Sequence, residues 1–493
     1  LTSEWREYDR TSTVVLDAYV KPIAAGYLAA LGQRLDEVGV RRETHYCMQS
    51  NGGISRFDVA AKAPIQLVES GPVGGVIGAA AIGRLIGERN LITLDIGGTT
   101  AKASLVEGDT VQLAGDYAIE RTPAFAGYPI KVPVVDIVEI GAGGGSIAWI
   151  DPAGALKVGP RSAGAEPGPA CYGSGGSEPT VTDANVIAGR INPDYFLGGK
   201  ISLDAGRARA VFASIADSLG VSVDDAALGV IRIANANMIH LLKLVSVRRG
   251  RDPRDFVIVA FGGGGSMHAC ALARELQVPR VIVPPNPGHF SAWGMLTSDL
   301  RHDVAQTRVG RVDRIPSWEI AELWSALEGR LLATFAEEGL DAGLVAFARV
   351  VDMRYAGQEH TVRVPVAEVD KVAEIERRFH DLHEQLYTFR LATPIEFVNF
   401  RVTGFGSVPK PELSRLDRDG DAAAALKGSR DVDFDVLGRR ESQVFERALL
   451  GAGSELEGPA VVEEPAASTV VFPGQRLRVD DFGNLIVDTG EES

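Results

Sequence analysis

Three glycine-rich loops, each directly after an apolar segment, constrain this sequence more than any other feature. They lie in LITLDIGGTTAKASLVEGD at 91–109, VEIGAGGGSIAWID at 138–151 and VIVAFGGGGSMHACALA at 257–273. A short apolar run that ends in glycines is typical of a buried strand followed by a tight turn. Because glycine has no Cβ, the backbone N–H groups of such a turn can approach an anion closely. Together the loops predict one phosphate-rich ligand, approached from several sides.

Asp95 stands at the end of the first of these strands, where a lone buried carboxylate is costly unless something there needs it. We predict that Asp95 holds a metal-bound water or orients a nucleophile near a phosphate. The next four residues would surround that phosphate, with N–H donors from Gly97 and Gly98 and hydroxyls from Thr99 and Thr100. Taken alone, the loop is also explained by a plain hairpin whose turn Asp95 caps, and that alternative is favoured.

The loop at Gly262–Gly265 precedes a helical pattern at 266–276. A helix N-terminus adds partial positive charge at the place where the glycines expose their N–H groups. The alternative is a tight strand–helix turn without a ligand, although four successive glycines carry a cost in backbone entropy. No Walker phosphate-binding loop occurs anywhere in the sequence.

Length and charge restrict the class of protein. A chain of 493 residues is too long for one core, so two or three domains are expected, with a boundary near 297–315. The net charge of −15 argues against a nucleic-acid or anionic-membrane partner. We predict no membrane span. The three cysteines fit neither a disulfide framework nor a zinc site, which predicts reduced thiols in the cytoplasm.

The hydrophobic pattern predicts a mixed α/β first part and a β-rich second part. Strands are expected at 91–95, 101–106, 132–140 and 145–150, and strand-rich segments at 353–366 and 396–409. Helices are expected at 11–40 (interrupted by Pro22), 69–87, 182–190, 204–219, 224–247, 317–339 and 374–388. Residues 255–284 have the length and pattern of one βαβ unit.

Several long motifs resemble the A subunit of the ATP-dependent hydantoinase/oxoprolinase family. They are REYDRTSTVVLDAYVKP, MQSNGG, SGPVGG, DIGGTTAK, EIGAGGGSIAWID, VGPRSAGAEPGPACYGSGGSEPTVTDANVIAGR, FGGGGSMHACALARELQVPRVIVPPNPG, LEGPAVVEEPAASTVVFPGQ and DDFGNLIV. The resemblance covers essentially the whole chain. It implies an α/β fold with a ribonuclease-H-like core of the actin, sugar-kinase and chaperone ATPase superfamily at 1–300. A C-terminal β-rich α+β domain is expected at 310–493.

The resemblance also implies where ATP and Mg²⁺, or another divalent ion, would bind. Asp95–Lys102 resembles the second phosphate loop of that superfamily, and Gly262–Ser266 resembles the adenosine-side loop. The residues implied to bind the nucleotide are Gly97, Gly98, Thr99, Thr100, Lys102, Gly263, Gly264, Gly265 and Ser266, and Asp95 is implied to bind the metal. The family's first phosphate loop lies in an N-terminal domain that would end about where Leu1 begins, so we expect activity to require that domain.

Asp95, Asp136, Glu139 and Asp183 are the candidate acid, base or metal-contacting residues, because each lies beside a glycine-rich or strand-end segment. For each of the last three, a capping or turn role is the favoured alternative. His268, in the first turn after the glycine loop, is predicted to face a substrate or to pack, with neither favoured. Cys171 has no paired base in the sequence, and we do not predict it as a nucleophile.

The family resemblance implies an A subunit that binds ATP and phosphorylates the oxygen of a small cyclic amide before ring opening. Its expected partner is a hydantoinase B-type subunit in a hetero-oligomer. One alternative is a subunit of a ketone carboxylase that acts on acetone or acetophenone and uses the same ATP chemistry. The other is a non-catalytic scaffold that presents half of a nucleotide site.

Overall fold

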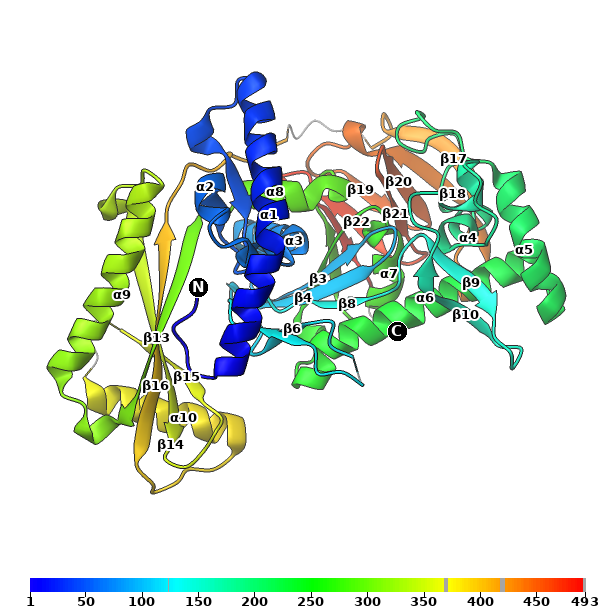
Figure 1. The fold of residues 1–493 in the computed structure, drawn as a ribbon. Helices are drawn as coiled ribbons and strands as arrows, with labels where there is room; N and C mark the ends of the chain where they lie inside the picture. The colour runs from blue at the N-terminus through cyan, green and yellow to red at the C-terminus, as the bar shows by residue number, and fades with distance from the viewer. Residues whose placement is uncertain (123, 368–370, 417–421, 491–493) are drawn as a thin grey trace. The chain divides into compact units, whose positions relative to one another are not determined.

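The computed structural model describes residues 1–122, 124–367, 371–416 and 422–490. They form two compact units, each assembled from separate segments of the chain (Figure 1). Unit 1 comprises Leu1–Val73, Leu113–Val135 and Ser298–Lys410, and unit 2 comprises Gly74–Gln112, Asp136–Thr297 and Pro411–Ser493. The domains expected from the sequence, 1–300 and 310–493, are each one continuous segment of the chain. They stay a prediction.

The main sheet of unit 2 has nine strands, and its centre carries the first and third glycine loops. At the centre, β3 (Leu91–Ile96) pairs antiparallel with β4 (Ala101–Glu107) and parallel with β11 (Val257–Phe261). All of β11 and most of β3 are buried, as continuous apolar strands between covered faces should be. The order is β19 (Glu455–Glu457), β22 (Arg476–Val479), β23 (Leu485–Asp488), β12 (Arg280–Val283), β11, β3, β4 and β5 (Thr110–Val111), with β8 (Val138–Ile140) also paired to β4.

The rest of unit 2 consists of helices, a hairpin and a second sheet. Its helices are most of α3 (Ser70–Ile86), α4 (Val181–Ile187), α5 (Ala205–Leu219), α6 (Val223–Val245), α7 (Gly265–Leu276) and α8 (Phe290–Leu296). The hairpin is formed by β9 (Ser146–Ile150) and β10 (Leu156–Ser162), and the second sheet by β17 (Leu426–Asp433), β18 (Arg439–Glu446), β20 (Ala460–Glu464) and β21 (Ala467–Val471). The longest buried helix is α6, which packs against α4, α5 and α7.

Unit 1 is built on a six-stranded sheet. Its order is β1 (Tyr46–Met48), β2 (Ile54–Arg56), β13 (Leu300–Arg311), β16 (Ile395–Gly406), β14 (Val345–Tyr355) and β15 (Val362–Val366). One face is covered by α9 (Ser317–Glu337) and α10 (Val372–Tyr387), through contacts such as Trp324 on Phe400 and Phe379 on Tyr355. The unit also contains α1 (Glu7–Glu37), α2 (Phe57–Ala60) and a hairpin of β6 (Tyr117–Ile119) and β7 (Tyr128–Ile130).

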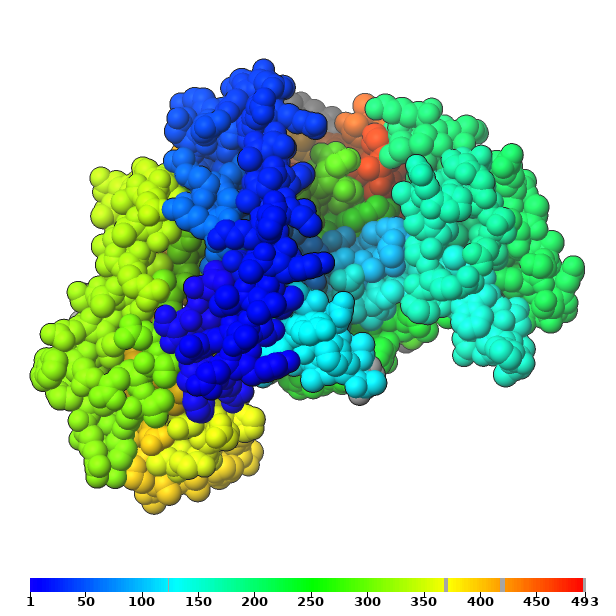
Figure 2. All heavy atoms as spheres, in the orientation of Figure 1, coloured from blue at the N-terminus to red at the C-terminus, as the bar shows by residue number. Residues whose placement is uncertain are grey.

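Helix α1 continues through Pro22 as one element, where the sequence allowed either two helices or a kinked one. Figure 2 shows much of α1 at the surface. The side chains of Tyr19 and Ile23 in this helix are largely exposed. By length and composition alone, α1 and the helical segment Val223–Arg249 could cross a membrane. Half of the second segment is buried, as in a core helix of unit 2. The absence of a membrane partner stays a prediction.

Most expected elements are present with shifted ends. The hairpin at 91–109 and the βαβ unit at 255–284 are confirmed. The strand expected at 132–140 is limited to Val138–Ile140, because the chain before Asp136 belongs to unit 1. Residues 300–311, inside the expected boundary, form the continuous strand β13.

Two helical glycines should respond in opposite directions to the same substitution. A Cβ at Gly294 in α8 would lie 1.9 Å from the carbonyl oxygen of Gly74 in α3, whereas nothing lies within 4 Å of a Cβ at Gly329 in α9. We expect Gly294→Ala to lower the free energy of unfolding by about 1–3 kcal/mol or more. Gly329→Ala should raise it by about 0.5–1 kcal/mol. Urea unfolding of both variants checks this, and equal effects would contradict the close approach of α3 and α8.

Candidate functional site

The three glycine loops predicted from the sequence meet in unit 2. The N–H of Gly144 donates to the carbonyl of Gly97 at 3.1 Å, and that of Gly145 donates to Gly98 at 2.6 Å. The third loop joins them because the N–H of Gly264 donates to the carbonyl of Ile96 at 2.9 Å. Backbone hydrogen bonds therefore hold all three loops in one place, as the prediction of a single ligand requires.

A pocket of about 170 Å³ opens where these loops meet, and we refer to it as the glycine-loop pocket. Its lining combines the loops with α4, α7 and the turn between β20 and β21. The lining residues are Ile96, Gly97, Gly98, Gly144, Tyr172, Thr182, Asn185, Ile191, Asn192, Tyr195, Phe196, Leu197, Gly263, Gly264, Met267, His268 and residues 463–468. It contains no lysine or arginine among the residues that the structure describes.

The glycines around this pocket are of two kinds. Gly262 has a positive φ of 78°, and a Cβ there would lie 2.4 Å from Asp95 Oδ1. A Cβ at Gly143 would lie 2.7 Å from the carbonyl oxygen of Gly97. By contrast, a Cβ at Gly98 would meet nothing within 4 Å, and one at Gly263 only the carbonyl oxygen of Ala466 at 3.8 Å. The packing of the described chain therefore requires glycine at 262 and 143, but not at 98 or 263.

Gly98 and Gly263 also present free donors. Within the part of the chain that the structure describes, neither backbone N–H makes a hydrogen bond. Both residues line the glycine-loop pocket, next to the N-terminus of α7, whose N-cap is Gly264. Unpaired N–H groups at a helix N-terminus form a site suited to an anion such as phosphate.

Asp95 lies beside the pocket at the end of β3, directly opposite Lys102 in β4. Burial raises the pKa of Asp95, the cation of Lys102 opposes that rise, and the nearby Glu139 carboxylate adds to it. Lys102 itself donates to Thr100 Oγ1 at 2.7 Å and pairs with Glu139 Oε1 at 3.3 Å. The structure therefore brings Asp95, Lys102 and Glu139 together into one charged group. Glu139 lies in β8 and does not line the pocket.

The other two predicted carboxylates have structural partners. Asp136 forms a two-pronged ion pair with Arg249, outside the pocket lining. Asp183 is completely buried and forms a capping box with Thr180 at the start of α4. It also accepts hydrogen bonds from the N–H groups of Ala170 and Cys171, at 3.3 and 2.8 Å. Asp183 therefore fastens the segment that contains Ala170 and Cys171 to α4. Catalytic roles for Asp136 and Asp183 stay predictions.

The remaining predicted residues lie at the loops. Thr99 Oγ1 lies 3.4 Å from Ser162 Oγ, close to the Gly97–Gly98 turn. Gly265 is the first residue of α7. The hydroxyl of Ser266 is turned away from the solvent and donates to the carbonyl of Ser468 at 3.0 Å. Ser266 thus ties α7 to β21 and leaves the backbone of the loop to face the pocket.

Sequence reasoning missed Glu463 and Glu464, two consecutive carboxylates at the end of β20 that line the pocket. Burial would raise the pKa of Glu463, but hydrogen bonds from Arg430 and Lys427 hold it below its usual value. Burial raises the pKa of Glu464, although Arg447 opposes the rise. Two acidic residues inside an otherwise apolar strand, VVEEPAAS, were the signal that could have identified them.

His268 lines the pocket and is buried. Its Nδ1 lies 2.7 Å from Asn235 Oδ1. Burial, helped by the charge of Arg190, lowers the pKa of His268 to about 3, so the ring is neutral at physiological pH. A neutral ring can donate from Nδ1 to Asn235 and keep Nε2 as an acceptor.

The described residues contain no group of three or more His, Cys, Asp or Glu that could hold a metal by themselves. Magnesium usually binds through one or two carboxylates together with phosphate oxygens and water. Asp95 supplies one carboxylate, next to N–H groups that could hold a phosphate, and so fits magnesium that binds together with phosphate oxygens. One carboxylate is too few for a magnesium site made only of protein ligands.

The sequence profile of the hydantoinase/oxoprolinase family matches residues 10–304, and that of its C-terminal domain matches residues 312–487. The chain belongs to the hydantoinase/oxoprolinase family. This confirms the family predicted from the motifs.

Relatives match almost the whole chain. The uncharacterized protein MJ0964 of Methanocaldococcus jannaschii is 37% identical, over 99% of this chain and 71% of that protein. Caprolactamase subunit alpha of Pseudomonas jessenii is 33% identical, over 96% of this chain and 69% of its own length. Acetone carboxylase beta subunit of Xanthobacter autotrophicus is 30% identical, over 96% of this chain and 68% of that protein. The last two names describe subunits of larger enzymes.

Two solved structures of family members superpose on the chain. The crystal structure of the ATP-dependent caprolactamase from Pseudomonas jessenii gives a TM-score of 0.86 at 32% identity, covering 99% of this chain and 71% of that one. The nucleotide-free structure of acetone carboxylase, whose carboxylation is ATP-dependent, gives a TM-score of 0.80 at 27% identity. The match covers 99% of this chain and 70% of that one. These matches confirm a mixed α/β fold shared with ATP-dependent enzymes.

Asp183→Ala should destabilise unit 2. The substitution leaves the buried N–H groups of Cys171 and Thr180 without an acceptor, at about 1–3 kcal/mol for each unsatisfied group. Asp204→Ala is the matched control, because Asp204 caps α5 at an exposed position with one backbone hydrogen bond. Urea unfolding should show a clearly larger loss for Asp183→Ala. A loss no larger than that of the control would contradict the anchoring role.

The pKa of His268 predicts an acid sensitivity. The folded-state pKa of about 3 lies below the ordinary value of 6.5, so the unfolded chain takes up the proton first as pH falls. The free energy of unfolding should therefore decrease from pH 6.5 towards pH 3. In His268→Gln this part of the decrease should disappear. Urea unfolding of both proteins at pH 7 and pH 5 measures the difference, and parallel pH profiles would contradict a buried, neutral His268.

Proposed function

We propose that this chain is the A-type subunit of an ATP-dependent cyclic-amide hydrolase of the hydantoinase/5-oxoprolinase type. The observation that carries the proposal is the meeting of three glycine loops at one pocket, where Gly98 and Gly263 offer free N–H groups. The strand order β5–β4–β3–β11–β12 supports it, with three antiparallel strands followed by two parallel ones. We propose that these five strands form the ribonuclease-H-like core in which the nucleotide would bind.

The phosphates of ATP would lie against the N–H groups of Gly98 and Gly263 and the N-terminus of α7. Asp95 would hold Mg²⁺ together with phosphate oxygens, and the ion would neutralise charge during phosphoryl transfer. The described lining has no basic side chain, and its two carboxylates, Glu463 and Glu464, are already paired with cations outside it, Glu463 with Lys427 and Arg430 and Glu464 with Arg447. Free nucleotide should therefore bind much more weakly than the metal–nucleotide complex.

The proposed reaction activates a poor electrophile. The amide oxygen of the ring attacks the γ-phosphorus of ATP, and ADP leaves. Water then adds to the activated carbon, the ring C–N bond breaks as nitrogen takes a proton, and the phosphoryl group leaves as phosphate after a second water attacks it. Phosphoryl transfer depends mainly on positioning and on charge stabilisation, which fixed backbone donors supply without reorganisation.

A ketone carboxylase subunit is the second candidate, because acetone carboxylase beta subunit is also a relative. Two comparisons favour a function like that of caprolactamase. The sequence identity is 33% to caprolactamase subunit alpha and 30% to acetone carboxylase beta subunit. The TM-score is 0.86 for the caprolactamase structure and 0.80 for the acetone carboxylase structure. In either case we propose that the chain works with a second, B-type subunit, as the subunit names of these relatives suggest.

Gly98→Val and Gly263→Val test the proposal. Because a Cβ at either position meets little in the chain, both variants should unfold at the wild-type temperature. The added side chain would occupy the space of the phosphates, so titration calorimetry should show Mg-ATP binding weakened at least tenfold. Gly329→Val, at an exposed glycine of α9 with equal room, is the matched control and should bind as wild type.

The same proteins, each extended by the N-terminal domain that activity is expected to require and combined with the B-type subunit, distinguish the two reactions. We expect a cyclic amide such as 5-oxoproline, hydantoin or caprolactam to stimulate ADP release, and the two valine variants to lose that stimulation. Stimulation only by a ketone with bicarbonate would favour the carboxylase. Unchanged Mg-ATP binding in both variants would refute the proposed nucleotide site.

A further inference from the structure

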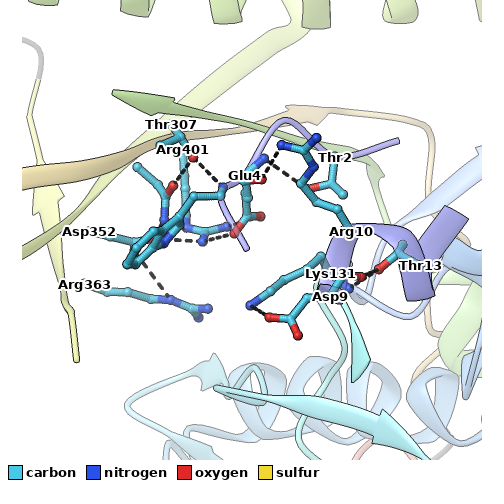
Figure 3. Close-up of polar contacts among 12 residues, drawn as sticks. Thr2, Glu4, Asp9, Arg10, Thr13, Lys131, Thr307, Asp352, Arg363 and Arg401 are labelled. Carbon is cyan, nitrogen blue, oxygen red and sulfur yellow. Dashed lines mark hydrogen bonds and ion pairs between the residues drawn. The ribbon is translucent and has the colours of Figure 1, made fainter. Parts of the chain in front are cut away.

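Unit 1 contains a second, larger pocket that shares no residue with the glycine-loop pocket, and we refer to it as the charged pocket. Its volume of about 660 Å³ lies within the range of small-molecule sites, about 300–1,000 Å³. The walls are the segment Leu1–Asp9, parts of the segment 113–133 and the face of the six-stranded sheet that α9 and α10 do not cover. Figure 3 shows several of its polar side chains, among them those of Lys131, Asp352 and Arg363.

The sheet face in this pocket is polar because the strands alternate. Asp352 in β14 lies opposite Arg363 in β15 and opposite Asn399 in β16, so all three side chains share one face. Arg401, two residues along β16, lies on the same face. The neighbours Val351 and Phe400 face the helices instead. The face is therefore a built polar surface and not an incidental cluster of exposed charges.

One carboxylate oxygen of this surface, Asp352 Oδ2, already accepts two hydrogen bonds. Asp352 Oδ2 accepts from Arg401 Nε at 2.9 Å and from Asn399 Nδ2 at 2.7 Å. The other two guanidinium nitrogens of Arg401 donate to both oxygens of Glu4, at 2.9 and 2.7 Å. This network fixes Asp352 and fastens the segment before α1 to the sheet.

The other oxygen, Asp352 Oδ1, is buried and accepts no hydrogen bond from any residue that the structure describes. Asp352 is only 2% exposed, and Arg363 Nε lies 3.9 Å from this oxygen, beyond hydrogen-bonding distance. A buried, unpaired carboxylate oxygen is unfavourable by more than an ordinary unsatisfied polar group. A ligand that brings an N–H donor to this oxygen would remove that penalty.

Two cations reach into the same space. Arg363 and Lys131 point toward one another in Figure 3. The Arg363 side chain is 47% exposed, and Lys131 Nζ lies 3.4 Å from Asp9 Oδ2. Among the described residues, neither forms a close, two-pronged ion pair. A guanidinium fork and an ammonium group that converge suit the two oxygens of a carboxylate.

The remaining lining narrows the ligand class. Acidic and basic residues are nearly balanced, with Arg6, Arg121, Lys131, Arg363 and Arg401 against Glu4, Asp9, Asp116, Asp303, Asp352 and Glu359. Such a balance disfavours a polyanion such as a nucleotide or a free phosphate. Apolar lining is also present, at Trp5, Pro129, Ile130 and Val350. The ligand should therefore carry little net charge and an apolar body.

We propose that the charged pocket binds a small zwitterion, an amino acid with an apolar side chain. Its carboxylate lies between Arg363 and Lys131, and its ammonium group donates to Asp352 Oδ1. The opposite charges that face the ligand are close together, 3.9 Å from Arg363 Nε to Asp352 Oδ1, as the adjacent charges of an amino acid require. This site does not depend on the proposed nucleotide chemistry, since it is formed by different residues.

Titration calorimetry of the 493-residue chain with three matched probes tests the proposal. L-phenylalanine carries both charged groups, 3-phenylpropionate lacks the ammonium group, and phenethylamine lacks the carboxylate. We expect phenylalanine to bind at least tenfold more tightly than either analogue, and inorganic phosphate not to compete with it. Equal binding of phenylalanine and 3-phenylpropionate, or competition by phosphate, would overturn the proposal in favour of a simple anion site.

Two arginine variants assign the binding to this pocket. Arg363→Gln removes the cation at a half-exposed position and should weaken phenylalanine binding at least tenfold. Arg377→Gln is the matched control, because it removes one positive charge at an exposed position of α10 that does not line the pocket. This variant should bind phenylalanine as tightly as wild type. Equal binding by both variants, or no phenylalanine binding by wild type, would refute the site. Mg-ATP titration of the same samples reports separately on the glycine-loop pocket.

Discussion

The close approach of Gly262 to Asp95 is the contact on which the candidate nucleotide site depends. The parallel pairing of β3 and β11 places Asp95 beside Phe261, so the chain leaves both strands at the same end of the sheet. With a positive φ and no space for a Cβ, Gly262 can turn there without displacing the Asp95 carboxylate. Carboxyl ends of neighbouring parallel strands are where α/β sheets commonly place ligands. The hydrogen bonds that add the 141–146 loop depend on this arrangement.

Much of this site could be predicted from the sequence because its signals are local. Strand-then-glycine patterns identified the Gly97–Thr100 and Gly262–Gly265 turns, and helical periodicity placed the long helices within a few residues, as at 204–219 against Ala205–Leu219. The roles of individual carboxylates were less accessible. The sequence favoured a capping role for Asp183, and Asp183 does form a capping box with Thr180. Its further hydrogen bonds from the N–H groups of Ala170 and Cys171 could not be predicted, because only the folded chain brings these groups to it.

Features that depend on pairing between distant segments were missed. Glu463 and Glu464 reach the glycine loops only because β20 pairs with β21, which packs beside α7. The alternation of Asn399, Arg401 and Thr403 with apolar residues is visible in the sequence, and ordinarily it indicates a strand with one solvent-exposed face. That Asp352 and Arg363 share this face follows from the register of three strands. Register is set by tertiary packing as well as by pattern, so the charged pocket could not be derived from one segment.

The two pockets use different donors, and the difference has a physical reason. Backbone N–H groups have no side-chain bulk, do not titrate and are held by the loops, so they suit a phosphoryl group whose charge shifts during reaction. Side-chain cations such as Arg363 can move and can be neutralised by a nearby carboxylate. A pocket that contains such pairs can therefore select small ligands by the arrangement of their charges. In the glycine-loop pocket, Glu463 and Glu464 already pair with the cations that lie nearest to them, those of Lys427, Arg430 and Arg447, so these cations are not free for a bare polyphosphate. If this pocket binds ATP as proposed, the absence of lysine and arginine from the described lining would make the accompanying cation part of the recognition.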